Sequence, residues 1–320
     1  MLKIIAVCAA LCACFPVFAQ TDDKPATLIE APAHAWPAPE RKMMLDATRA
    51  GTRIVAVGEH GIVLLSDDDG QSFRQAAKVP VSSTLTAVTF SDAEHGWAAG
   101  HWGTIIATQD GGETWKLQRV DTSTDQPLFS VDFLDAREGF AAGLWSLLLA
   151  THDGGSTWTR VPVPKPVGDS RADRNLYRVF SDHANAIYIT AEQGSVLRSR
   201  DGGANWSWLE TGGKGSLWAG TAAPDGRLMV GGLLGNTFES RDGGQTWSHM
   251  DSHSSGSITD LVATRGGVVG VGLDGFVLEA RNGAPNFSAI QRADRAALTA
   301  VVTNGKNTLV LFSKDGVIRR

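Results

Sequence analysis

Short apolar runs, separated by turns rich in glycine and aspartate, fill the chain from residue 44 onward. The stretch 85–117 shows the pattern most clearly: residues 85–90 alternate in polarity, 96–100 and 104–108 flank a tight turn, and 114–117 follow a second turn. Runs of about five residues with many Val, Ile, Thr and aromatic side chains predict antiparallel strands. No long segment after the N-terminus has the apolar period of a helix, so we expect an all-β fold.

Two markers repeat along the chain and set the number of structural units. One is an octapeptide of the form Ser/Thr-x-Asp-x-Gly-x-Thr-Trp, with copies at 66–73, 108–115, 151–158, 199–206 and 240–247 and a degenerate copy at 280–287. The other is a turn between two apolar runs, at Gly61, Gly103, Ser146, Gly194, Gly235, Gly275 and Gly316. Its seven copies are 40 to 48 residues apart. Four predicted strands per unit at this period predict a seven-bladed β-propeller of four-stranded antiparallel blades.

The seventh unit contains only three predicted strands, and an unpaired sheet edge invites mispairing. We therefore expect the mature N-terminal segment to close the ring, with residues 26–30 beside Val317 and Ile318 as a fourth strand. This divides the chain into a signal peptide at 1–19, an N-terminal segment at 20–43 that supplies the closing strand, and the propeller at 44–320.

The aspartate of each octapeptide is predicted to be structural. An Asp side chain in a turn accepts backbone N–H groups two or three residues further on, and the glycine that follows tolerates a positive φ. The Trp supplies a large ring for packing between blades. Repetition in every unit argues against a single active site, so we assign the turns to stabilisation at Asp68, Asp110, Asp153, Asp201 and Asp242.

The N-terminus has the features of a secretory signal. Lys3 precedes an apolar stretch at 4–18, and Val17-Phe18-Ala19 forms a small-residue cleavage site before Gln20. The apolar stretch is too short to span a membrane. These features predict a cleaved signal and a periplasmic protein; the alternative is lipid attachment at Cys14.

Cysteine content and charge exclude several classes of function. All three cysteines, Cys8, Cys12 and Cys14, lie within the predicted signal, so the mature chain would have no disulfide, thiol nucleophile or cysteine–metal site. The full chain has 29 basic against 34 acidic residues, which disfavours nucleic acid as a partner. We expect no cofactor and no metal. His60 and His101 occupy equivalent turns, where a metal pair or two solvated side chains would both fit.

The repeat, and above all residues 96–115, resembles that of the photosystem II stability/assembly factor family. The resemblance extends over about residues 40–320. It implies a seven-bladed propeller with bacterial-neuraminidase-type Asp-box repeats and a non-catalytic assembly scaffold. It also implies a location in the lumen or periplasm and binding of precursor reaction-centre subunits. The signal is of the ordinary bacterial type, which suits a bacterial relative, photosynthetic or not.

The second-to-third strand turns and the inter-blade loops are expected on one face of the ring, opposite the Asp turns. Tight turns normally carry polar residues, so large apolar residues there indicate an interaction surface. A long inter-blade loop at 162–174 would add basic side chains. The candidate partner-binding residues are Trp102, Trp145, His101, His60, Leu233, Leu234, Lys165, Arg171, Arg174 and Arg178. The expected partner of this monomer is a membrane-protein complex or its precursor subunit.

A second hypothesis is a glycan-active propeller, either a sialidase-like glycosidase or a lectin, because sialidases share the Asp motif. Such an activity would use the central channel near Tyr177, Trp218 and Asp260. Tyr177 would be the nucleophile, but no Glu is clearly paired with it. A structural role for this tyrosine is the simpler interpretation.

Overall fold

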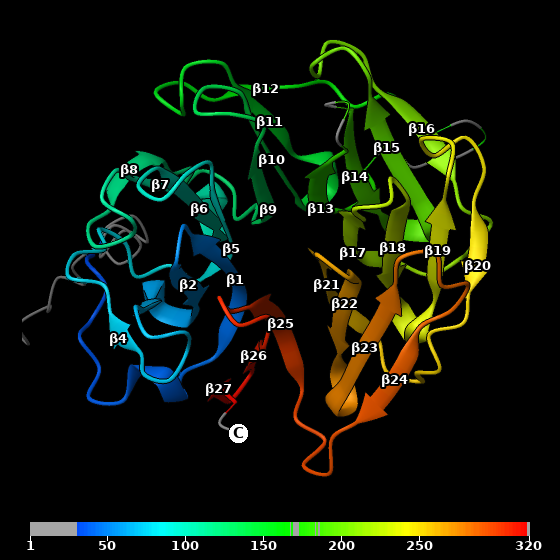
Figure 1. Cartoon of the computed structure of the whole chain (residues 1–320). Helices are drawn as coiled ribbons and strands as arrows, with labels where there is room; N and C mark the ends of the chain where they lie inside the picture. The colour runs from blue at the N-terminus through cyan, green and yellow to red at the C-terminus, as the bar shows by residue number, and fades with distance from the viewer. Residues whose placement is uncertain (1–30, 167, 169–172, 183, 185, 319–320) are drawn as a thin grey trace, which may run out of the picture.

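Seven β-sheets surround a central axis (Figure 1), which confirms the predicted all-β, seven-bladed propeller. The computed structural model describes residues 31–166, 168, 173–182, 184 and 186–318. The predicted signal peptide, Cys14, the cleavage site before Gln20, residues 26–30 and Arg171 lie outside these described residues. No helix among the described residues is long and apolar enough to cross a membrane.

Each blade is an antiparallel sheet whose strands follow chain order from the axis to the rim. Blade 1 comprises β1 (Met44–Ala50), β2 (Arg53–Gly58), β3 (Val63–Ser66) and β4 (Arg74–Gln75). Blade 2 comprises β5 (Leu85–Phe90), β6 (Gly96–Gly100), β7 (Ile105–Thr108) and β8 (Lys116–Arg119). Blade 3 comprises β9 (Leu128–Phe133), β10 (Gly139–Gly143), β11 (Leu148–Thr151) and β12 (Thr159–Arg160).

The remaining blades repeat this order. Blade 4 comprises β13 (Leu176–Ser181), β14 (Ile187–Ala191), β15 (Ser195–Ser199) and β16 (Ser207–Glu210). Blade 5 comprises β17 (Leu217–Ala222), β18 (Leu228–Gly232), β19 (Thr237–Ser240) and β20 (Ser248–Met250). Blade 6 comprises β21 (Ile258–Thr264), β22 (Gly267–Gly272), β23 (Phe276–Arg281) and β24 (Ser288–Gln291). Blade 7 has three strands among the described residues: β25 (Leu298–Thr303), β26 (Leu309–Ser313) and β27 (Gly316–Val317).

The second strand of each blade is covered by a neighbouring blade on both faces. Every residue of β6, β10, β14, β18 and β22 is buried. A strand buried on both faces gains from an uninterrupted apolar run, which explains why these segments do not alternate in polarity. The apolar cores therefore lie between blades. Trp97 of blade 2, for example, stacks on Phe133 of blade 3 with ring centroids 3.5 Å apart.

The Asp turns join the third strand of a blade to its fourth. In blade 2, Asp110 accepts the Thr114 N–H at 2.9 Å and the Thr114 hydroxyl at 2.5 Å. The Thr108 hydroxyl donates to Asp110 at 2.8 Å and accepts the buried Gly112 N–H at 3.0 Å. Gly112 has a φ of +90°, a conformation that glycine adopts readily. Equivalent bonds recur around Asp68, Asp153, Asp201 and Asp242, with the Asn205 side-chain amide in place of the hydroxyl donor at Asp201.

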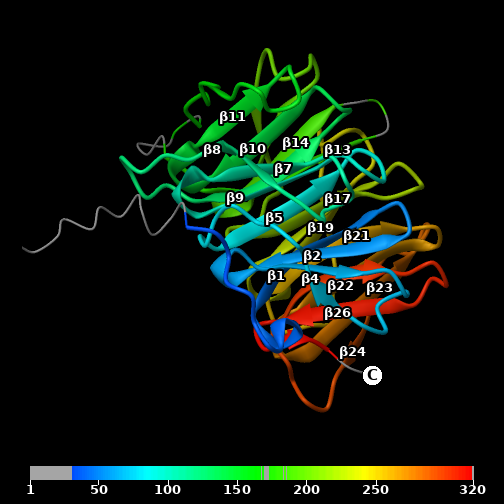
Figure 2. The same cartoon turned by 90° about the vertical axis from the view of Figure 1, so that its left-hand side faces the viewer.

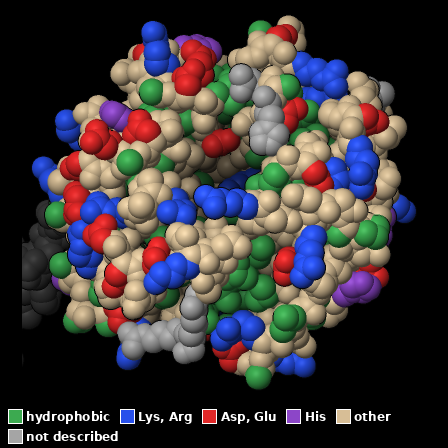
Figure 3. All heavy atoms as spheres, in the orientation of Figure 1, with side chains coloured by type: hydrophobic (Ala, Val, Ile, Leu, Met, Phe, Trp, Pro, Cys, Tyr) green, Lys and Arg blue, Asp and Glu red, His purple; other side chains and the backbone are tan. Residues whose placement is uncertain are grey.

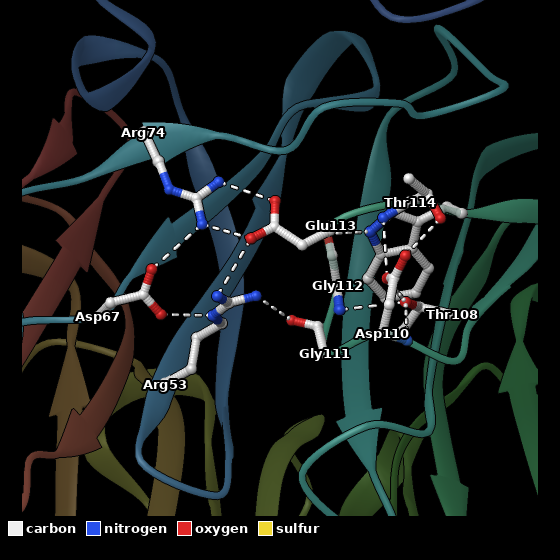
Figure 4. A network of polar contacts seen from close by, with 10 residues as sticks. Arg53, Asp67, Arg74, Thr108, Asp110, Gly111, Gly112, Glu113 and Thr114 are labelled. Carbon is white, nitrogen blue, oxygen red and sulfur yellow. Dashed lines mark hydrogen bonds and ion pairs between the residues drawn. The ribbon is translucent and has the colours of Figure 1, made fainter.

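A network of ion pairs joins the Asp turns of blades 1 and 2 (Figure 4). Arg53 donates to Asp67 at 2.6 Å and to the Gly111 carbonyl at 3.0 Å. Its guanidinium also lies 3.1 Å from Glu113, which binds Arg74 as well. Arg74 in turn donates to Asp67 at 3.1 Å. Two arginines and two carboxylates thus connect adjacent blades at their turns, where networks contribute more than isolated surface pairs.

The ring closes between blade 7 and blade 1, and Figure 2 shows blade 1 between blades 2 and 7. Thr299 of β25 donates its hydroxyl to the Met44 carbonyl of β1 at 2.6 Å. At the Asp-turn end, Asp69 accepts the Gly305 N–H at 3.0 Å, and the Asp69 carbonyl accepts the Asn304 side-chain amide at 3.1 Å. First and last blades therefore make direct contact at the axis and at the turns.

The described part of the N-terminal segment, 31–43, contains no strand. Ala33 donates its N–H to Val79 at 3.0 Å, and the Trp36 N–H binds Gln75 at 3.1 Å, so this stretch lies along blade 1. Its one 3-10 turn, η1 (Pro39–Arg41), lies beside β27 and β4. Because residues 26–30 are outside the described residues, their role as a closing strand stays a prediction.

The Thr108 hydroxyl offers a direct test of the Asp turn. Replacement Thr108→Val keeps the shape but leaves the buried Gly112 N–H without its acceptor and removes a donor to Asp110. We expect a loss of roughly 1–3 kcal/mol in the free energy of unfolding, measured by urea denaturation. The control Thr122→Val changes an exposed threonine and should stay within about 0.5 kcal/mol of wild type. Equal stability of the two variants would show that the hydrogen bonds of Thr108 make no net contribution to the free energy of unfolding.

Candidate functional site: the turn face and the central channel

Six short 3-10 turns and the inter-blade connections occupy one end of the ring, which we call the turn face. The turns are η2 (Glu59–Gly61), η3 (His101–Gly103), η4 (Leu144–Ser146), η5 (Glu192–Gly194), η6 (Leu233–Gly235) and η7 (Leu273–Gly275). Backbone bonds tie them to the connections: Leu144 donates to Pro127 at 3.0 Å, and Leu233 donates to Ser216 at 2.9 Å. The face is therefore a rigid rim rather than a set of independent loops.

The middle residue of each turn has a left-handed backbone, although none is glycine. These residues are His60, Trp102, Trp145, Gln193, Leu234 and Asp274, with φ between 53° and 64°. Bulky residues rarely adopt this conformation, which costs on the order of 1 kcal/mol or more. It directs two apolar side chains outward: Trp145 is 50% exposed and Leu234 is 70% exposed. Leu233 and Leu273 are also exposed, whereas Trp102 is half-buried.

Three aromatic side chains occupy equivalent positions on the innermost strands of adjacent blades. Phe129 on β9, Tyr177 on β13 and Trp218 on β17 are each the second residue of their strand, next to the turn face, and each is half-buried. The Phe129 and Tyr177 rings stack, with centroids 5.7 Å apart and an interplanar angle of 20°. Blades 3 to 5 thus carry aromatic residues at the channel end, and the turns of blades 3 and 5 add the exposed apolar residues Trp145 and Leu234.

Deeper in the channel, one arginine lies among three aspartates, and we call Asp46, Asp132, Arg178 and Asp260 the axial cluster. Figure 3 shows the central hollow with charged side chains of both signs around it. Arg178 of β13 binds Asp46 of β1 across the axis, with nitrogen–oxygen distances of 3.3 and 3.4 Å. The Arg178 side chain keeps 29% of its surface accessible although protein surrounds it, as expected for a group in a channel.

The aspartates of the axial cluster also connect blades. Asp46 accepts the Val88 N–H of blade 2 at 2.9 Å, and Asp260 accepts the Val301 N–H of blade 7 at 3.0 Å. Asp132 accepts the Thr89 hydroxyl at 3.2 Å. Each carboxylate therefore already has a structural hydrogen bond, which accounts for its presence without a catalytic role.

The channel shifts the ionisation of its charged groups. Burial raises the pKa of Asp132 to about 6 and that of Asp260 to about 6, although Arg178 opposes both shifts. Burial alone would lower the pKa of Arg178, but the carboxylates of Asp46, Asp260 and Asp132 outweigh it and raise the pKa. The arginine stays charged and holds the cluster together.

The predicted basic residues do not gather on one surface. Arg178 lies in the channel, and Arg174 is 6% exposed, bound to Ser195, to Gln193 and over the Trp208 ring. Lys165 is exposed on its loop. His60 lies against Trp36, and His101 lies 4.0 Å from Asp125. Among the described residues, no group of three or more His, Cys, Asp or Glu could hold a metal ion.

Comparison with known proteins identifies the family. The family described as "Photosynthesis system II assembly factor YCF48" matches residues 75–304, more than two thirds of the chain. The chain belongs to this family. The match confirms the resemblance found in the repeat, and the family's assembly function favours a scaffold over the glycan-active alternative.

Two curated relatives are members of the same family. The chain is 39% identical over 136 residues to "Photosystem II assembly protein Ycf48" of Thermosynechococcus vestitus, covering 42% of this chain and 38% of the relative. It is 34% identical over 163 residues to "Photosystem II assembly lipoprotein Ycf48" of Picosynechococcus sp., covering 51% of this chain and 46% of the relative. The matched stretches thus span less than half the length of either relative.

Solved structures share the fold. "YCF48 bound to D1 peptide" superposes with a TM-score of 0.69 at 18% identity, covering 90% of this chain and 97% of that one. "YCF48 from Cyanidioschyzon merolae" gives 0.68 at 16% identity with the same coverage. "Structure of U3-55K" gives 0.69 at 8% identity, covering 88% of this chain and 91% of that one. At these identities the likeness shows the propeller architecture alone.

Sequence reasoning missed two features of this family member's site. Phe129 was not singled out, although alignment of the innermost strands would have placed it beside Tyr177 and Trp218. The axial cluster was missed because Asp46, Arg178 and Asp260 come from blades 1, 4 and 6, which are far apart in the chain. No local pattern indicates a contact across the axis.

The raised pKa values of the axial cluster predict a pH dependence of stability. An aspartate in an unfolded chain has a pKa of about 3.9, so between about pH 4 and 6 the folded protein binds protons that the unfolded chain releases. Protonation of Asp132 and Asp260 therefore stabilises the folded protein at low pH. This contribution to the free energy of unfolding is lost as the pH rises through the window. We expect Asp132→Asn, which cannot ionise, to gain on the order of 1–2 kcal/mol relative to wild type between about pH 4.5 and pH 7.

Urea denaturation at both pH values measures this difference. The control is Asp135→Asn, because backbone N–H groups of Glu138 and Arg137 lower the pKa of that exposed carboxyl. Between about pH 4.5 and pH 7 Asp135 is largely ionised in folded and unfolded chains, so its difference from wild type should change by no more than about 0.2 kcal/mol. A flat difference for Asp132→Asn as well would contradict the raised pKa.

Proposed function

We propose that the protein is an exported, non-catalytic scaffold that binds a subunit or assembly intermediate of a membrane-protein complex through the turn face of blades 3 to 5. Trp145 and Leu234 are the proposed centre of the contact. The observation that carries this proposal is their exposure on strained, left-handed turns, which the fold does not itself require.

One further feature supports the choice of blades 3 to 5, and a solved structure supports the class of ligand. The half-buried aromatic residues Phe129, Tyr177 and Trp218 lie on the same three blades, next to the turns that carry Trp145 and Leu234. Aromatic and large aliphatic side chains dominate the energetics of protein interfaces. A family member, "YCF48 bound to D1 peptide", has been seen with a peptide ligand, which supports a protein segment as the ligand class here.

Export is part of the proposal. The predicted signal would be cleaved before Gln20 and release a periplasmic protein, or Cys14 would carry a lipid, as the name of the Picosynechococcus relative suggests for that protein. We expect the mature chain isolated from the host to begin at Gln20, as read by N-terminal sequencing and intact mass. A lipid-modified N-terminus at Cys14 would instead support anchoring.

The turn face can be tested with a double variant, Trp145→Ala/Leu234→Ser. Both side chains are exposed, so the fold should remain stable while membrane-protein partners, recovered by affinity purification from detergent-solubilised host membranes, fall by about tenfold or more. Quantitative mass spectrometry against wild type measures the recovery.

The matched control is Ile290→Ser, which removes an equally exposed side chain, 73% accessible, from the outer strand β24. It should leave recovery unchanged. If the control loses partners as strongly as the double variant, or the double variant keeps them, the contact lies elsewhere on the ring.

A further inference from the structure

A groove runs along the outer rim where blade 7 meets blade 1. Its volume is 760 Å³, and one wall comes from the Asp turn of blade 1 and the other from the strands of blade 7. Figure 3 shows apolar side chains in a hollow on the side of blade 7 that faces blade 6, in the lower centre of the view. The side chains that give the groove its apolar character are Phe73, Leu309, Val310, Leu311, Val317 and Ile318.

The groove lies where the other six blades carry a fourth strand. Blade 7 ends at β27 among the described residues, so β27 is its outermost strand. Ile318 donates its N–H to Leu311 of β26 at 2.9 Å. Because backbone groups of successive strand residues point to opposite sides, the N–H and carbonyl of the preceding residue, Val317, point away from β26 toward the groove. This is the geometry of an edge that accepts another strand.

The chain's own N-terminal segment is held away from this edge. Ala33 is bound to Val79 and Trp36 to Gln75, both on the blade 1 side. Within the described stretch 31–43, η1 contacts β27 at its first residue, Gly316, and Trp36 packs against the apolar cluster between blades 7 and 1. Residues before Ala33 would have to reverse direction to reach Val317. The observations therefore favour an occupant from another protein over residues 26–30.

The lining specifies the chemistry of this occupant. An extended segment beside β27 would turn every second side chain toward the blade 1 side of blade 7, where Phe73 and Val317 lie, so these residues should be apolar. A strand antiparallel to β27 would enter from the Asp-turn end. There the Lys306 side chain is 74% exposed and forms a loose ion pair with Asp69 at 3.9 Å. An acidic residue near the start of the segment would complement it.

We propose that this strand groove binds an extended, alternately apolar segment of a partner protein as the fourth strand of blade 7. The inference rests on the proposed scaffold function and adds a second contact to it: the turn face binds the partner, and the strand groove captures an extended segment of that partner. Strand addition supplies main-chain hydrogen bonds for affinity, and the groove supplies side-chain selectivity.

A defined probe tests the strand groove. The probe is a fluorescein-labelled synthetic peptide, Glu-Val-Thr-Val-Thr-Phe-Thr-Val-Gly, and the matched control is a peptide of the same composition in which the apolar residues are consecutive. We expect saturable binding of the alternating peptide to the mature chain by fluorescence anisotropy, and slower hydrogen exchange at the Val317 amide. The consecutive-order peptide should bind at least about fivefold more weakly.

Two variants distinguish peptide binding in the strand groove from non-specific binding to the protein. Val317→Pro removes the N–H that faces the groove but leaves the Ile318 bond to Leu311, and it should weaken binding by about fivefold. Lys306→Glu should weaken it by a similar factor through charge repulsion at the open end. Circular dichroism and urea denaturation confirm that both variants are folded. Binding that is unchanged in both variants would overturn the proposal.

The other occupants are distinguished in the same experiment. If deletion of residues 20–30 tightens peptide binding and speeds exchange at Val317, the chain's own segment fills the groove. If the mature chain dimerises and the dimer excludes the peptide, a second copy does so. Either result overturns the partner strand. The Trp145→Ala/Leu234→Ser variant should still bind the peptide, so failure of the turn face and failure of the groove remain separate findings.

Discussion

Ring closure is the constraint on which the rest of this structure depends. Each blade buries both of its faces against neighbours, so no blade is complete until the last one meets the first. The bond from Thr299 to the Met44 carbonyl at this junction has the same form as those from Thr86 to Leu128 and from Thr259 to Leu298 inside the ring. The ring therefore closes at its innermost strands by the contact that joins consecutive blades. The rim of blade 7 takes no part in that bond, and so the strand groove can stay open without breaking the ring.

The sequence predicted the architecture because the signals for it are local. An Asp turn is formed by residues within an eight-residue stretch, as the bonds among Thr108, Asp110 and Thr114 illustrate, and its recurrence every 40 to 48 residues determines the number of blades. The path of the N-terminal segment was less predictable, because the contact of Ala33 with Val79 depends on tertiary packing rather than on strand propensity. The axial cluster could not be predicted from the sequence for the same reason, because Asp46 and Arg178 are 132 positions apart. The sequence identified Trp145 and Leu234 as candidate surface residues because large apolar side chains are unusual in tight turns. Only the structure showed that these two side chains are exposed.

Three adjacent blades carry aromatic residues at the second position of the innermost strand, where blade 1 has Leu45. At the second position of the innermost strand, blades 2, 6 and 7 have Thr86, Thr259 and Thr299, each of which donates its hydroxyl to a carbonyl of the next blade. Blades 3, 4 and 5 have Phe129, Tyr177 and Trp218 at this position. Aromatic rings cannot reproduce the threonine bond, so these blades exchange inter-blade hydrogen bonds for apolar surface at the end of the channel.

The axial cluster offsets this loss. Ser130 of blade 3 accepts the Val179 N–H of blade 4 at 3.0 Å, one position further along the strand from Phe129. Arg178 then connects blade 4 to Asp46 of blade 1 on the far side of the axis. A charged bond across the centre restrains the aromatic blades from within, where water is limited and the attraction is stronger than at the surface. The arrangement lets one sector of a repetitive ring carry a specialised surface while the polar contacts that hold that sector in place lie out of a partner's reach.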